Sequence, residues 1–168
     1  AIEGDEIVFG KENVLLLANY DESKIPPKKY LTDNGDGSYT STGKVAWIFL
    51  DEEEQVGLYS AQITFAKGAS GAAGIAFRMT LPNVDYAFEA GCDYLSAQFA
   101  PANGGLQVCS VTEGKWAQMP GSVVPLTSLP ESWQQKYNNA QTEITAELSV
   151  ADYGNKFEIY IDGALAYT

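Results

Sequence analysis

The chain has 168 residues, of which 45% are hydrophobic and 19% are charged, a length and composition typical of one globular domain. It carries 10 Lys and Arg residues against 22 Asp and Glu residues, a net charge of −12, which argues against nucleic acid and anionic membranes as partners. The absence of histidine excludes Ser-His-Asp and Cys-His catalysis and His-ligated zinc. Apolar runs such as residues 14–18 and 45–50 are far shorter than the ~20 residues of a membrane helix, so membrane insertion is not expected.

The N-terminal third predicts short strands separated by polar turns. Apolar stretches favour strands over residues 7–9, 14–17, 45–50 and 58–65. Between them, residues 33–38 read Asp-Asn-Gly-Asp-Gly-Ser, a sequence typical of a turn.

The centre of the chain predicts an antiparallel hairpin. Residues 74–79 and 84–90 both alternate between apolar and polar side chains, around a turn at 81–83. Placing Phe77 opposite Phe88 sets Arg78 near Asp85 and Glu89 on the other face of the hairpin. This register predicts an ion network around Arg78.

The second half continues as strands divided by Gly- and Pro-rich turns. Strands are expected over 95–99, 106–111, 116–119, 143–150 and 157–161, with a tight hairpin turn at Asp162–Gly163. Residues 120–130 predict a loop, and 132–140 one or two helical turns. The whole pattern predicts an all-β fold, an antiparallel β-sandwich of the jelly-roll type with two curved sheets, little or no helix, and residues 1–168 as a single domain.

Four segments in this order carry a resemblance to a known family: Gly-Ile-Ala-Phe-Arg at 74–78, Asp-Tyr-Ala-Phe-Glu at 85–89, Leu-Gln-Val at 106–108, and Phe-Glu-Ile-Tyr-Ile-Asp-Gly at 157–163. The chain resembles concanavalin A-like or laminin-G-like jelly rolls over roughly residues 40–168. The resemblance implies glycan binding by one sheet face or loop edge. Such domains occur in bacterial extracellular enzymes and adhesins, so it also implies a secreted or cell-surface protein with adjacent modules.

Three aromatic residues are the candidates for stacking against a sugar. Trp116 leads a short polar strand, and Trp133 and Tyr137 lie in the polar stretch 131–137. An aromatic face suits the apolar C–H face of a sugar ring. The alternative for each of them is packing in the core.

Arg78, Asp85 and Glu89 are the polar candidates for ligand contact. The arginine fork can hydrogen-bond adjacent sugar hydroxyls, although the structural ion network remains the alternative. The two carboxylates are separated by four strand residues, about 13 Å, which is too far for a glycosidase pair. A non-catalytic carbohydrate-binding module is therefore predicted, with an adhesin or structural domain and a glycoside hydrolase of the same fold as alternatives.

Two further predictions concern metal and sulfur chemistry. Asp33 and Asp36 offer closely spaced oxygens of the kind that calcium prefers, and predict a structural Ca²⁺ site. A plain turn is the alternative. Cys92 and Cys109 are the only cysteines, and they are expected to be free thiols because two strand spacings would separate them.

Overall fold

The computed structural model describes residues 7–9, 16–21, 24–28, 32–36, 38–41, 45–49, 56–80, 91 and 93–168. Strands dominate these residues, with one α-helix and one 3₁₀ turn. Their order along the chain is β1 (Ile7–Phe9), β2 (Leu16–Asp21), β3 (Lys24–Lys28), β4 (Thr32–Asp33), β5 (Tyr39–Ser41), β6 (Val45–Phe49), β7 (Val56–Ala66), β8 (Ala72–Thr80), β9 (Asp93–Ala100), β10 (Gly105–Thr112), β11 (Lys115–Val124), η1 (Leu126–Ser128), α1 (Glu131–Asn139), β12 (Glu143–Tyr153), β13 (Phe157–Ile161) and β14 (Ala164–Tyr167).

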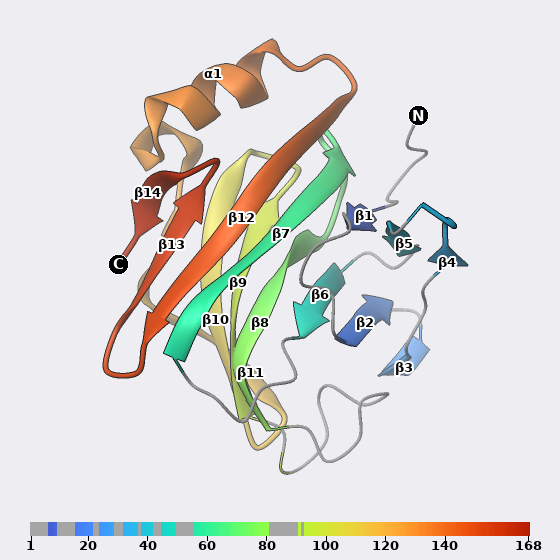
Figure 1. The fold of residues 1–168 in the computed structure, drawn as a ribbon, viewed down its shortest axis with the longest axis vertical. Coiled ribbons are helices and arrows are strands. Elements are labelled where there is room, and N and C mark those ends of the chain that lie inside the picture. Colours follow the sequence, from blue (N-terminus) through green and yellow to red (C-terminus); the bar gives the residue numbers. More distant parts are fainter. Residues whose placement is uncertain are drawn as a thin grey trace.

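The strands form two seven-stranded sheets that pack face to face (Figure 1). Sheet A has the order β14-β13-β12-β7-β1-β5-β4, and sheet B has the order β11-β10-β9-β8-β6-β2-β3. The described pairings are antiparallel apart from β6 and β8, which run parallel. The predicted all-β sandwich with little helix is confirmed, and the jelly-roll strand order stays a prediction.

The core lies between the sheets because alternate residues of each strand point inward. In β12, Ile144, Ala146, Leu148 and Val150 are buried in this core, as the alternation in the sequence predicts. The core side chains of the two sheets interlock, with the rings of Phe65 in sheet A and Phe99 in sheet B 5.4 Å apart. Burying each large apolar side chain contributes roughly 1.5–3 kcal/mol.

Two tight turns follow directly from local sequence. Asp162 and Gly163 both adopt positive φ, 50° and 81°, and connect β13 to β14. Glu113 and Gly114 do the same between β10 and β11, with φ of 50° and 75°. Two consecutive positive φ angles characterise the hairpin turn whose twist matches the strands. The predicted turn at Asp162–Gly163 is confirmed.

The predicted central hairpin has the wrong register. Ile75 lies between Ile48 of β6 and Ala97 of β9, so strands other than residues 84–90 pair with β8 on both sides at this point. Phe77 pairs with Leu95 on the β9 side, and residues 81–90 lie outside the described residues. Local alternation cannot distinguish these partners, because strand pairing depends on contacts made across the whole sheet.

Candidate functional site

Trp116 lies on the face of sheet B that points away from the core. In β10, Leu106 and Val108 point into the core, so Gln107, Cys109 and Val111 lie on the opposite face. Trp116 pairs with Val111 across the β10–β11 ladder, and paired residues share a face. Its side chain remains 47% exposed, which leaves ring surface available to a ligand.

The Trp116 ring is anchored by a buried polar cluster on the same face. Burial raises the pKa of the Cys109 thiol, and hydrogen bonds from Gln98, Trp116 and Ser96 only partly oppose this. The Gln98 amide nitrogen donates to the Cys109 sulfur at 3.2 Å. The thiol therefore stays protonated, and its hydrogen bond with the Trp116 side chain links the exposed ring to this cluster.

A groove of about 420 Å³ lies along the same strands. It forms where β11 bulges: Cys109 pairs with Gln118 and Gln107 pairs with Val123, so four residues of β11 span a gap that one residue of β10 fills. Gln107, Gln118, Val123 and Thr127 are among the residues that line the groove. It therefore combines amide donors and acceptors with apolar surface.

Gln118 connects the groove to the tryptophan. It is two residues from Trp116 on the same strand, about 7 Å along the strand and on the same face. Its side chain is exposed. An exposed ring, an exposed amide and an open groove are thus contiguous on this face.

The prediction that Trp133 and Tyr137 form an exposed platform is wrong. The two residues lie four apart on α1, so they share one helix face, and they are only 1% and 6% exposed. The Trp133 ring stacks on Phe99 at 4.9 Å, and its indole N–H donates to the Gly104 carbonyl at 2.8 Å. The Tyr137 hydroxyl donates to the Pro101 carbonyl at 2.7 Å. These residues hold α1 against the end of the sandwich.

The prediction that Arg78 lies on the face opposite Phe77 is also wrong. The β8–β9 ladder changes register between Phe77 and Thr80, and Arg78 adopts a φ of 52°. Such a bulge breaks the alternation and redirects the side chain. The guanidinium lies 5.5 Å from the Phe157 ring centroid, and Phe157 in turn packs on Phe77 at 5.1 Å.

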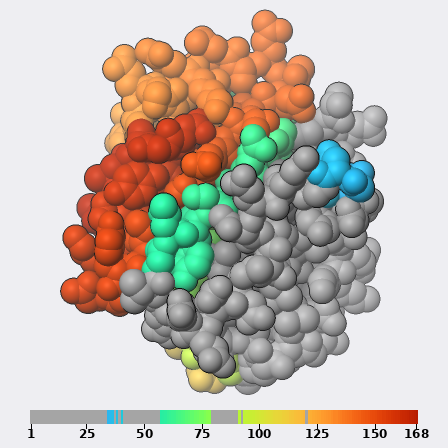
Figure 2. Space-filling view, in the orientation of Figure 1, coloured from blue at the N-terminus to red at the C-terminus, as the bar shows by residue number. Residues whose placement is uncertain are grey.

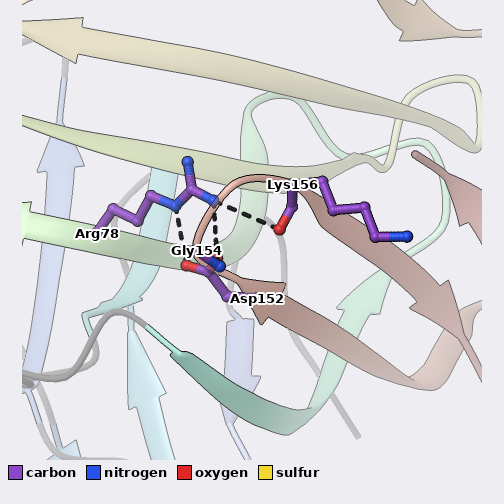
Figure 3. A network of polar contacts seen from close by, with 4 residues as sticks. All are labelled: Arg78, Asp152, Gly154 and Lys156. Carbon is purple, nitrogen blue, oxygen red and sulfur yellow. Dashed lines mark hydrogen bonds and ion pairs between the residues drawn. The ribbon is translucent and has the colours of Figure 1, made fainter.

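Arg78 ties the two sheets together (Figure 3). Its Nε and Nη2 donate to the two Asp152 carboxylate oxygens at 2.9 and 2.7 Å. The Gly154 N–H donates to the same carboxylate at 2.9 Å. Burial acts to raise the pKa of Asp152, but these hydrogen bonds and the arginine charge hold it below its usual value. The predicted partners Asp85 and Glu89 lie outside the described residues.

The predicted calcium ligands lie at a polar turn. The Asp36 carboxylate accepts a hydrogen bond from the Ser38 N–H at 2.9 Å, and Asp33 is the last residue of β4. Within the described part of the chain, no group of three or more Asp, Glu or Cys side chains is placed to hold a metal ion. The calcium site stays a prediction.

Cys109 is a free thiol, as predicted, and Cys92 lies outside the described residues.

Sequence reasoning missed Gln107 and Gln118 as candidate ligand contacts. The hairpin turn at 113–114 was a usable signal, because it sets which residues of the two flanking strands face each other. The i, i+4 spacing of Trp133 and Tyr137 likewise indicated a shared helix face.

No family model, curated protein or solved structure matches this chain. Among the described residues, no helix is long and apolar enough to span a membrane.

Proposed function

We propose that this chain is a non-catalytic carbohydrate-binding module whose ligand stacks on Trp116. The observation that carries the proposal is the half-exposed indole ring, held in place beside a groove lined by glutamine amides. A sugar ring presents an apolar C–H face together with peripheral hydroxyls. The indole face packs against the former, and the Gln107 and Gln118 amides can donate to and accept from the latter.

Two physical features support binding at this face. A ring with a fixed orientation loses little conformational entropy when a ligand docks, which improves affinity. The groove volume of about 420 Å³ falls within the ~300–1,000 Å³ range of small-molecule sites.

The net charge of −12 favours an uncharged glycan over an anionic one at this face. The resemblance to secreted jelly rolls supports a role outside the cell, as one module of a larger chain. A structural Ca²⁺ at Asp33 and Asp36 remains part of this proposal.

A glycan array followed by calorimetric titration of the hits tests the proposal. Trp116→Ala should weaken binding about tenfold or more, whereas Trp116→Phe, which keeps an aromatic face, should retain most of the affinity. Leu165→Ala removes another half-exposed apolar side chain and serves as the control. The proposal fails if no glycan binds, or if Trp116→Ala binds as tightly as the wild type with an unchanged melting temperature.

A further inference from the structure

The outer face of sheet A carries an aromatic cluster that sequence analysis did not identify. Tyr153, Glu158 and Tyr160 come from β12 and β13, whose ladder pairs Ala151 with Glu158 and Ser149 with Tyr160. Because Val150 and Ile159 point into the core, these residues lie on the opposite face. Figure 2 looks onto this face, with residues of β7 in green beside β12–β14 in orange and red.

One carboxylate holds both tyrosine rings in place. The Tyr160 hydroxyl donates to Glu158 Oε2 at 2.7 Å. The negative charge of Glu158 raises the pKa of Tyr153, and a hydrogen bond between the two side chains adds to this. The hydrogen bond to Glu158 is likewise the main reason that the pKa of Tyr160 is raised. Both phenols therefore stay neutral donors, and the rings are pre-organised on an exposed surface.

A groove of about 490 Å³ lies beside this cluster. Its walls include Leu58, Glu147, Tyr153 and Tyr160. Leu58 is 69% exposed and Tyr153 50% exposed, and both line this one groove, so they place exposed apolar surface next to each other, as interaction sites do. The groove therefore offers aromatic and aliphatic contact surface on a rigid strand scaffold.

The charges around this groove determine whether it favours a positively or a negatively charged ligand. Glu147 and Asp152 line it and Glu158 is adjacent. Arg78 pairs with Asp152, so Glu147 and Glu158 are the carboxylates that can face a ligand, and no Lys or Arg is itself a lining residue. An ammonium group already rests here: Lys156 Nζ lies 5.2 Å from the Tyr153 ring centroid. A cation placed over an aromatic face in this way is attracted by the negative charge density of the ring. The surroundings thus favour a positively charged group and disfavour sulfated or uronic acid sugars.

We propose that the outer face of sheet A is a second binding site, which takes an amine-bearing sugar chain. The C–H face of the sugar packs on Tyr153, Tyr160 and Leu58, and its ammonium group pairs with Glu147 or Glu158. The Trp116 site is on the opposite face of the sandwich, so both sites can be occupied together. The module would then cross-link two glycan strands.

Calorimetric titration in the Trp116→Ala background tests this site while the other is disabled. The probes are a glucosamine oligomer and its fully N-acetylated counterpart of equal length, in which a neutral acetamide replaces each charged ammonium group. The amine form should bind and the acetylated form should bind at least about tenfold more weakly. Equal binding of the two forms, or no binding of the amine form, overturns the proposal.

Variants separate this groove from the general negative charge of the protein. Tyr153→Ala and Glu147→Gln should each weaken binding of the amine oligomer about tenfold. Glu131→Gln makes the same change in net charge at the first residue of α1, which is not among the residues that line the groove, and should change affinity by less than about twofold. Tyr160→Phe keeps the ring but removes its hydrogen bond to Glu158, and should have an intermediate effect.

Three outcomes would contradict the site. One is an equal loss in Glu131→Gln, and another is wild-type affinity in Tyr153→Ala with an unchanged melting temperature. The third is oligolysine binding with the same affinity and the same variant pattern, which would indicate charge alone. Failure here leaves the Trp116 site intact, because that site is scored separately with neutral glycans and Trp116→Ala in an otherwise wild-type chain.

Discussion

Replacing Arg78 by methionine is expected to destabilise the protein by about 3–5 kcal/mol, because it leaves the Asp152 carboxylate buried without its charged partner. The Asp152 side chain is 1% exposed, whereas that of Arg78 is 24% exposed. Methionine keeps the aliphatic part of the side chain but lacks the guanidinium that lies over the Phe157 ring. The loss should therefore report the guanidinium contacts, chiefly the ion pair with Asp152 and to a smaller extent the cation–π contact with Phe157.

The difference in burial predicts an order of effects. After Asp152→Asn the arginine can turn toward solvent, and the asparagine oxygen can still accept from the Gly154 N–H, so the cost should be only about 1–3 kcal/mol. The double variant should cost less than the sum of the two single variants, since no uncompensated charge remains buried.

At acidic pH, the ion pair between Arg78 and Asp152 should contribute less to the free energy of unfolding. The pKa of Asp152 is lowered in the folded state, so its stabilisation is complete above the unfolded-state pKa of about 3.9 and is lost as the pH falls through the lower folded-state pKa. The gap in stability between wild type and Arg78→Met should be full at pH 7 and smaller near pH 3, where the unpaired carboxyl of the variant is protonated.

Urea unfolding followed by circular dichroism measures these differences. In a thermal melt of a chain of this size, a loss of about 3–5 kcal/mol in the free energy of unfolding would lower the melting temperature by about 6–20 °C. A cost below about 1 kcal/mol for Arg78→Met, or a larger cost for Asp152→Asn than for Arg78→Met, would refute the assignment of this pair as a buried link between the sheets.

Three other predictions concern single residues. Gly74→Ala should lower the free energy of unfolding in urea by about 3 kcal/mol, because an added Cβ would overlap the backbone of the neighbouring strand β9. Wild-type stability in this variant would show that the two backbones are not in such close contact. Cys109, fully buried and with its pKa raised, should react with a thiol reagent only after denaturation in a Cys92→Ser variant; fast labelling of the native protein would contradict this. Trp133→Phe keeps an aromatic ring but leaves the buried Gly104 carbonyl without its hydrogen-bond donor. It should lower the free energy of unfolding by about 1–3 kcal/mol. An unchanged unfolding midpoint would show that this hydrogen bond contributes little to stability.

Local sequence was sufficient for several strands and turns of this protein, although β11 continues to Val124, into residues predicted as a loop. The alternation of residues 143–150 predicted the core face of β12, because side chains of a strand point to opposite sides in turn. Asp162 and Gly163 predicted a hairpin turn because these residue types tolerate positive φ. Such features depend on neighbours in the chain, so the sequence alone determines them.

Tertiary structure decided which polar and aromatic residues are buried and which are exposed. Trp133 lies in a polar stretch, and its burial requires the ring of Phe99 and the carbonyl of Gly104, both from the β9–β10 hairpin. Arg78 finds Asp152 across 74 residues of chain, and a one-residue bulge turns it toward the core. The tyrosines that share Glu158 become neighbours only once β12 and β13 pair. In each of these cases the free energy comes from groups distant in sequence, so no local pattern could reveal it.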